Sequence, residues 1–168
     1  MLPFLLLPVL VAQAPAPASV IPGAVEVAPG VFVLKGLPHP GLCEILPKVH
    51  VVRVVDLRRD DEPNLDCEAE ASRLEPMGIQ YLRYTVTNHP TVADFDFLRT
   101  LLRDLPRSAR VLIHCSNGNR AAAAVVPWLL LDHGKSIEEA FSIARSAGLK
   151  SPDTESAIRK YLAANGRT

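Results

Sequence analysis

The sequence predicts an α/β domain whose central, mostly parallel sheet carries helices on both faces. Residues 49–57 form the strongest candidate strand, an almost unbroken run of apolar and mostly β-branched residues. A strand of this composition is typical of a parallel sheet that helices cover on both faces. Other candidate strands alternate with helical segments along the chain, which is the order found in α/β folds. The length of 168 residues favours one domain.

The other elements follow from apolar periodicity and from end signals. Strands are expected at residues 31–34, 49–57, 79–86 and 111–114, and helices at 66–74, 91–105, 120–133, 136–147 and from 151 or 153 to about 164. Residues 91–94 and 136–139 match capping boxes, and Gly134 and Gly148 are expected to end helices. Pro127 removes one backbone hydrogen bond from its helix, which costs about 3 kcal/mol unless packing offsets it.

Composition narrows the possible partners and cofactors. The formal charge is zero and 48% of the residues are hydrophobic, which indicates neither a nucleic-acid binder nor a disordered chain. The five histidines show no ligand spacing with carboxylates or cysteines, so we expect no metal and no other cofactor. The charged residues 58–62 follow the strongest strand, at the edge of a parallel sheet where ligands bind.

The first 18 residues are typical of a secretory signal peptide. Residues 2–11 are an apolar run too short to span a bilayer comfortably, and a small-x-small site predicts cleavage after Ala14. We therefore expect a secreted or periplasmic protein without stable membrane insertion after cleavage. No Lys or Arg precedes the run, which leaves a misassigned start or an uncleaved anchor as alternatives. Residues 19–29 are expected to be an extended linker and residues 30–168 the folded domain.

Export bears on the three cysteines of the chain. In an oxidising compartment two of them tend to pair, and the simplest arrangement joins Cys43 to Cys67 and leaves Cys115 free. The alternative is that Cys43 and Cys67 stay separate thiols, because spacing alone does not determine connectivity.

The most informative stretch is the segment around Cys115. The short strand at residues 111–114 leads into a loop of small and polar residues, and an apolar helix follows at 121–131. Backbone N–H groups at such a helix start bind anions, and a cysteine there is expected to be partly thiolate at neutral pH. Gly118 allows the sharp turn, and Arg120 offers a planar guanidinium to two oxyanion oxygens. The alternatives are a buried structural cysteine and a surface ion pair for Arg120, although a cation at a helix start opposes the helix dipole.

His114, Cys115, Gly118 and Arg120 resemble the signature loop of cysteine-dependent protein phosphatases, His-Cys-x-x-Gly-x-x-Arg. Here only four residues separate the cysteine from the arginine, a spacing similar to that of rhodanese sulfurtransferases. Residues 112–120 are most similar to the phosphatase-like family associated with beta-lactamase-hydrolase-like proteins, which combines a phosphatase fold with this shorter loop. The likeness extends over about residues 30–162.

The resemblance implies a three-layer, protein tyrosine phosphatase-like fold of the dual-specificity type, with Cys115 as nucleophile and Arg120 as oxyanion binder. It also implies that His114 supports the thiolate, although a core histidine is the alternative. Loop-lining side chains are Ser116, Asn117 and Asn119, each of which is also a good turn residue.

The proton donor is the least defined part of this mechanism. In the phosphatases that the chain resembles, an Asp lies on the loop before the helix that precedes the signature, where this chain has Asn88. The candidates in its place are His89, Asp60, Asp61 and Asp94. Asp94 is already explained by a capping box, and Asp60 and Asp61 also fit a solvated turn.

Three functions follow from these observations. The first is a phosphatase that forms a cysteinyl-phosphate from a phosphorylated small molecule or protein. The second is a sulfurtransferase with a persulfide on Cys115, which the short loop favours and which needs no general acid. The third is an anion or phospho-ligand binding module, which Asn88 would allow, as would Ala121 in place of the Ser or Thr that follows the arginine in many phosphatases.

Overall fold

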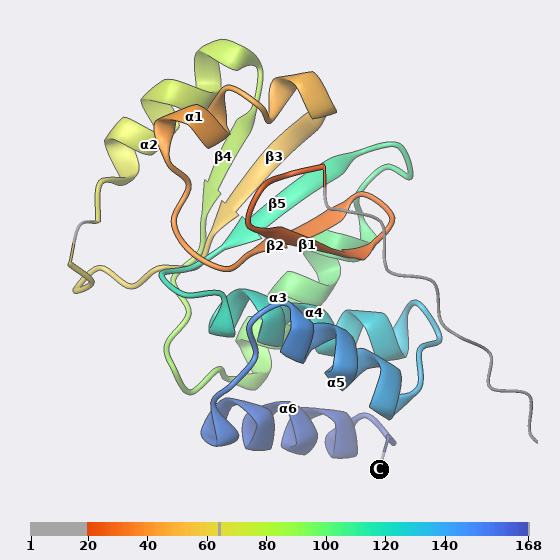
Figure 1. The fold of residues 1–168 in the computed structure, drawn as a ribbon. Helices are drawn as coiled ribbons and strands as arrows, with labels where there is room; N and C mark the ends of the chain where they lie inside the picture. Colours follow the sequence, from red (N-terminus) through yellow and green to blue (C-terminus); the bar gives the residue numbers. More distant parts are fainter. Residues whose placement is uncertain (1–19, 64, 168) are drawn as a thin grey trace, which may run out of the picture.

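The computed structural model describes residues 20–63 and 65–167, which form one mixed five-stranded sheet covered by helices (Figure 1). The strands are β1 (Ala24–Ala28), β2 (Val31–Leu34), β3 (Val51–Asp56), β4 (Gln80–Arg83) and β5 (Arg110–His114). Their order in the sheet is β1-β2-β5-β3-β4. Strand β1 is antiparallel to β2, and all other pairs are parallel. The predicted α/β class with a mostly parallel sheet is confirmed.

The helices form two layers, one on each face of the sheet (Figure 1). The smaller layer contains α1 (Pro40–Cys43), α2 (Cys67–Leu74) and the 3-10 turns η1 (Pro47–Val49) and η2 (Glu75–Met77). The larger layer contains α3 (Val92–Arg103), α4 (Asn119–Leu131), α5 (Ile137–Ser146) and α6 (Pro152–Ala164). Thr91 and Ser136 cap α3 and α5 in the two predicted capping boxes, and Ser151 caps α6.

Side chains alternate between the two faces along each strand, so the strands contribute apolar side chains to the core on both sides of the sheet. On β5, Val111 and Ile113 pack into the core under α3–α6, while Leu112 packs into the core under α1 and α2. Phe32 of β2 joins Leu112 on the second side. Because β5 is the middle strand and is apolar on both faces, the residue that follows it is held at the centre of the sheet edge.

Helix α4 is the central helix of the larger layer. Residues 119–130 are all buried, and α4 contacts α3, α5 and α6. The run Ala121–Ala124 has small side chains, which lets the helix lie close to the sheet. The helix continues across Pro127, so packing on all sides offsets the hydrogen bond that proline removes.

Two boundaries differ from the sequence-based predictions. Residues 24–28 were predicted to belong to an extended linker but form β1, because a turn at Gly30 (φ +80°) folds them back along β2 and buries Ala24 and Val27. The folded domain therefore begins before residue 30. Strand β4 is shorter than the predicted 79–86. After it, the N–H groups of Tyr84 and Val86 make isolated hydrogen bonds to the carbonyl oxygens of Asp56 and Leu57, and the regular ladder between the strands does not continue.

All three cysteines are free thiols in the structure. Cys43 is buried at the end of α1, and Cys67 begins α2. The structure thus favours separate thiols over the predicted Cys43–Cys67 pair.

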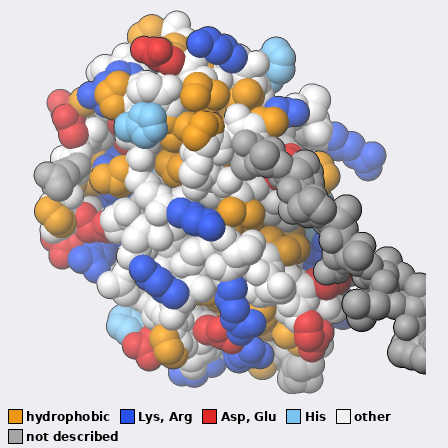
Figure 2. Space-filling model, viewed as in Figure 1, with side chains coloured by type: hydrophobic (Ala, Val, Ile, Leu, Met, Phe, Trp, Pro, Cys, Tyr) orange, Lys and Arg blue, Asp and Glu red, His pale blue; other side chains and the backbone are white. Residues whose placement is uncertain are grey.

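The predicted signal peptide, residues 1–18, lies outside the described residues. Among the helices of residues 20–63 and 65–167, none has the length and hydrophobicity needed to cross a bilayer. Acidic and basic side chains are interspersed on the face that Figure 2 shows.

Candidate active site

The end of β5 places Cys115 at the carboxyl edge of the sheet, between the ends of β2 and β3. The side chain is fully buried, with its Sγ 3.9 Å from Oδ1 of Asn117. The N–H groups of Ser116, Asn117 and Gly118 donate to no group within the described ranges 20–63 and 65–167. Helix α4 begins directly after Gly118. Free N–H groups at a helix start favour an anion next to the thiol.

Two glycines make the turn of this loop possible. Gly118 has φ +85°, and an added Cβ would lie 3.0 Å from the Cα of Lys35 and 3.1 Å from the carbonyl oxygen of Ala147. Gly148 has φ +116° and packs on Gly118, because its own added Cβ would lie 3.3 Å from the Gly118 Cα. The loop is therefore enclosed by backbone on two sides. The predicted role of Gly148 as a helix end is only part of its function.

Arg120 is buried over the loop rather than exposed in a surface ion pair. Its Nη1 donates to the carbonyl oxygens of Leu57 and Val86, both at 3.0 Å, and its Nη2 donates to Oγ of Ser116 at 3.0 Å. Burial alone would lower the pKa of Arg120, but hydrogen bonds with Glu62 and the charge of the adjacent Cys115 raise it. A side-chain hydrogen bond between Arg120 and Cys115 also raises the pKa of Arg120, so the guanidinium lies next to the thiol.

Glu62 is a site residue that the sequence-based reasoning missed. Its carboxylate oxygens lie 2.5 Å from Nη1 and 2.8 Å from Nη2 of Arg120, and it also accepts the N–H of Arg59. Burial alone would raise the pKa of Glu62, but the hydrogen bonds from Arg120 hold it at about 2. Glu62 is therefore ionised at neutral pH and cannot donate a proton. The charged run 58–62 indicated that carboxylates lie at this edge, but not which one turns inward.

The side chains of Asn117 and Asn119 stabilise the conformation of the loop and its contacts with neighbouring segments. Asn117 Oδ1 accepts the N–H of Asn119 at 3.1 Å, as in an Asx turn. Asn119 points to α6: its Nδ2 donates to Oγ1 of Thr154, and its Oδ1 accepts the N–H groups of Lys150 and Ser151. For these two asparagines the structure favours the role of turn and contact residues.

The four predicted proton-donor candidates have different surroundings. Asp94 is held by the α3 capping box and accepts the hydroxyl of Tyr84. Asp60 pairs with Arg83, and Asp61 pairs with Arg59.

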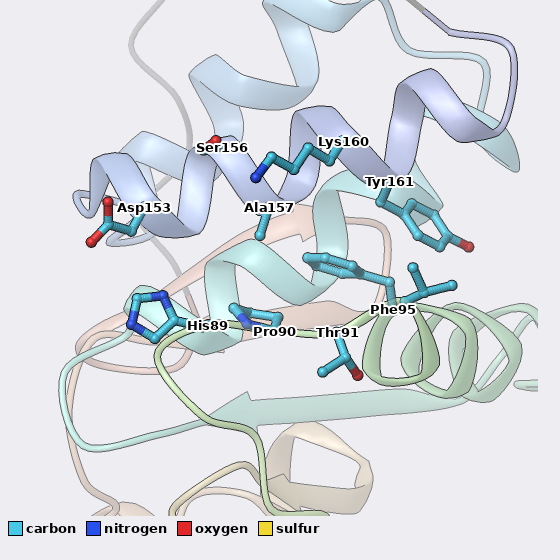
Figure 3. Close-up of a pocket in the computed structure, with 10 residues that line it drawn as sticks. His89, Pro90, Thr91, Phe95, Asp153, Ser156, Ala157, Lys160 and Tyr161 are labelled. Atoms are coloured by element: carbon cyan, nitrogen blue, oxygen red, sulfur yellow. The ribbon is translucent and has the colours of Figure 1, made fainter.

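His89 is exposed on the segment between β4 and α3. This segment is tied to the site, because Arg120 binds the Val86 carbonyl and Thr154 Oγ1 donates to the Asn88 carbonyl at 3.1 Å. His89 and Asp153 of α6 line a cavity of about 450 Å³. Figure 3 shows His89 at one end of the row of lining residues, with Asp153 across from it. Among the four candidates His89 is the one without an ion pair or a capping role in the described structure.

His114 is fully buried at the end of β5, beside Asp56 and Glu70. Ligand-type atoms of Asp56, Glu70 and His114 lie within 4.8 Å of one another. However, Nη2 of Arg58 lies 2.7 Å from Asp56 and 2.5 Å from Glu70. A guanidinium that already pairs with both carboxylates makes this a poor metal site.

No family model matches the chain, and no curated protein matches it. Solved structures do match. A DUF442 protein from Shewanella putrefaciens CN-32 superposes with a TM-score of 0.70 at 20% identity, over 86% of this chain and 93% of the other. The active form of Tk-PTP gives 0.70 at 21% identity, over 84% and 97% of the two chains. Human DUSP28 gives 0.66 at 24% identity, over 92% and 99%.

The fold is that of the protein tyrosine phosphatases. The predicted resemblance to dual-specificity-type phosphatases is thereby confirmed for the fold. A further match is the complex of PTPMT1 with PI(5)P, with a TM-score of 0.67 at 18% identity over 86% of this chain and 99% of PTPMT1.

We predict that Gly118→Ala destabilises the protein more than Gly134→Ala does. Both glycines have positive φ, so each alanine costs about 1 kcal/mol in backbone strain. Only at Gly118 does the new methyl group meet backbone atoms, whereas nothing lies within 4 Å of the corresponding position at Gly134. Overpacking adds about 1–3 kcal/mol. Urea unfolding measures both variants, and equal losses of unfolding free energy would contradict the packing of this loop.

We predict that the stability difference between wild type and Glu62→Gln narrows as the pH falls. The pKa of Glu62 is lowered from its ordinary value of 4.5 to about 2, so its contribution is present above pH 4.5 and is lost as the pH falls through about 2. That contribution is at most about 3 kcal/mol. Denaturant unfolding between pH 6 and pH 2 measures it, with the exposed Glu68→Gln as a control for removal of one carboxylate. A difference that stays constant over this range would contradict the ion pair with Arg120.

Proposed function

We propose that the protein is a cysteine-dependent phosphatase that hydrolyses phosphate monoesters. The observation that carries this proposal is the convergence of three features on one point. The Cys115 thiol directly follows the central strand, the N–H groups of residues 116–118 donate to no group within the described residues, and the buried Arg120 lies against the thiol. A tetrahedral oxyanion is the ligand that such a set of donors binds best.

In the first step the thiolate of Cys115 attacks phosphorus. An S–P bond forms, the P–O bond to the leaving group breaks, and the leaving oxygen takes a proton from an acid of the protein. Arg120 and the loop N–H groups hold the three equatorial oxygens, on which charge grows in the transition state. In the second step water attacks phosphorus and gives a proton to the deprotonated acid, the S–P bond breaks, and phosphate and the thiolate are released.

His89 is our candidate for the acid. Its loop is held against Arg120 through the Val86 carbonyl and against α6 through the Asn88 carbonyl. Asp60, Asp61 and Asp94 each have a charged or capping partner that competes for the carboxylate. An imidazole can exchange a proton near neutral pH, which suits it to this role.

The alternative is a sulfurtransferase, which the short Cys115–Arg120 spacing favours. The Cys115 thiolate would attack the sulfane sulfur of thiosulfate, breaking the S–S bond and releasing sulfite. Cyanide would then attack the outer sulfur of the persulfide, giving thiocyanate and the thiolate. A third possibility is a binding module for phosphorylated ligands, in which the loop binds the oxyanion and no reaction follows.

We further propose that the chain is exported and acts outside the cytoplasm, on the basis of the signal-peptide pattern in residues 1–18. Its substrate would be a phosphorylated small molecule or protein.

We predict that the mature chain, from about residue 19, releases phosphate from an aryl phosphate and that Cys115→Ser abolishes this activity. Cys43→Ala, which removes a buried thiol on the other face of the sheet, is the matched control and should keep wild-type rates. A second half of each preparation is assayed with thiosulfate and cyanide. Cys115-dependent thiocyanate without phosphate release would establish the sulfurtransferase instead. Full activity of Cys115→Ser in either assay would refute the nucleophile.

We predict that His89→Asn slows hydrolysis of an alkyl phosphate by about 10²-fold or more, since general acid catalysis has this magnitude. Hydrolysis of an aryl phosphate with an acidic leaving group should change much less, because that leaving group departs without a proton. Asp60→Asn and Asp61→Asn are measured beside it. If either of these variants shows the leaving-group-dependent loss and His89→Asn does not, the assignment to His89 is wrong.

A further inference from the structure

A second cavity lies at the opposite end of the sheet from Cys115. Val31, the first residue of β2, and Ala109, which precedes β5, line this cavity, whereas Cys115 follows the last residue of β5. The ends of α3 and α4 form its other walls. Its volume is about 550 Å³, and sites for small molecules have about 300–1,000 Å³. None of residues 114–120 lines it, so the cavity is separate from the candidate active site.

The inner wall of this cavity is apolar. Trp128 of α4, Leu102 of α3 and Val31 are buried core residues that line it, and the half-buried Leu105 adds to the same wall. Trp128 is the only tryptophan of the chain. Its ring lies 4.0 Å from that of His133, centroid to centroid, so His133 holds the indole from one side. An indole in the wall of a cavity offers a large rigid surface to a flat apolar group.

The charged residues around the cavity favour an anion. Asp132 is the carboxylate that lines it, and this carboxylate already accepts Nε of Arg99 at 2.5 Å and Nη2 of Arg99 at 3.0 Å. Two other arginines line the cavity. Arg103 lies 3.6 Å from Asp104 in an exposed pair, and Arg107 is exposed and pairs with no carboxylate within residues 20–63 and 65–167. The cavity thus has two available guanidinium groups, while its carboxylate is matched from within the protein.

The segments that carry these groups are held in place by backbone contacts. The N–H of Ala109 donates to the carbonyl of Pro106 at 2.8 Å, which closes a tight turn around Arg107. The N–H of Val111 donates to the carbonyl of Gly30, also at 2.8 Å, and joins this turn to the loop before β2. The pair of Arg99 with Asp132 joins α3 to the end of α4. A cavity whose walls are fixed in this way loses little entropy when a ligand binds.

We propose that this cavity binds an amphipathic organic anion, with a flat apolar body and a single carboxylate or sulfonate group. The apolar body lies against Trp128 and Leu102, where it removes apolar surface from water. The anionic group accepts hydrogen bonds from Arg103 and Arg107, because a guanidinium matches the planar spacing of two such oxygens. The site is independent of the proposed phosphatase reaction, since it shares no residue with the loop at Cys115.

The probe for this site is 1-anilinonaphthalene-8-sulfonate, which combines aromatic rings with one sulfonate. Its emission rises when it leaves water, so a titration of the full chain gives a dissociation constant. The emission of Trp128 is a second signal, because no other tryptophan contributes to it. Both signals should give the same dissociation constant, and a Trp128 emission that does not respond to the probe would overturn the proposal.

We predict that Arg103→Ala and Arg107→Ala each weaken binding of the probe by about threefold, and that the double variant weakens it by about tenfold, as expected for exposed charge pairs. Both arginines are exposed, so their removal leaves the core in place. The matched control is Arg73→Ala, which removes an exposed guanidinium from α2 in the other helix layer and should leave the affinity unchanged. An equal affinity of the double variant and the wild type overturns the proposal.

Two further variants locate the probe. Ala109→Phe places a ring in the cavity without changing its charge, and should weaken binding by about tenfold, which corresponds to 1.4 kcal/mol. Ser116→Glu adds a carboxylate to the exposed part of the Cys115 loop and should leave the affinity unchanged. If Ser116→Glu abolishes binding and Ala109→Phe does not, the probe binds at the loop and the proposal is wrong. Binding needs no turnover, so the result is separate from the outcome of the phosphatase assay.

Discussion

The ion pair between Arg120 and Glu62 is the contact on which the geometry of the site depends. Through it and through the carbonyls of Leu57 and Val86, one guanidinium joins the start of α4 to the segments that follow β3 and β4. Three neighbouring chain segments at the carboxyl edge of the sheet thus converge on a single side chain. A buried guanidinium is stable there only because its charge is matched and its Nη donors are used.

A second set of contacts ties the loop to the opposite end of the chain. Asn119, between Gly118 and Arg120, binds Thr154 and the backbone at the start of α6, and Thr154 in turn binds the Asn88 carbonyl. The segment that carries His89 is therefore held from α4 and from α6. This arrangement differs from a freely moving lid, because the loop reaches the site through backbone carbonyls that are already engaged. A proton donor on it would act from a fixed position.

Much of the fold and the centre of the site could be predicted from the sequence, because they depend on local patterns. The buried strands, the capping boxes at Thr91 and Ser136 and the Cys115 loop rest on local patterns that tertiary contacts do not override. Strand β1 was missed because its five residues follow a Pro-rich stretch and owe their conformation to pairing with β2. Glu62 was missed because three consecutive acidic residues are indistinguishable until the chain bends. Only the structure shows that the third one turns inward to Arg120.

The charges around Cys115 explain how a buried site can receive an anion. Arg120 is matched by Glu62, and the buried Arg58 is matched by Asp56 and Glu70. Neither group therefore holds a large excess of positive charge that would need a permanent counterion. Binding of an oxyanion then depends on the loop N–H groups, which donate to no group within the described residues. Directional donors of this kind select a tetrahedral oxyanion by geometry as well as by charge, because each N–H must meet an oxygen. The loop therefore recognises the oxyanion through backbone groups that are held in fixed positions. For this reason the two glycines that enclose the loop belong to the site together with the cysteine and the arginine.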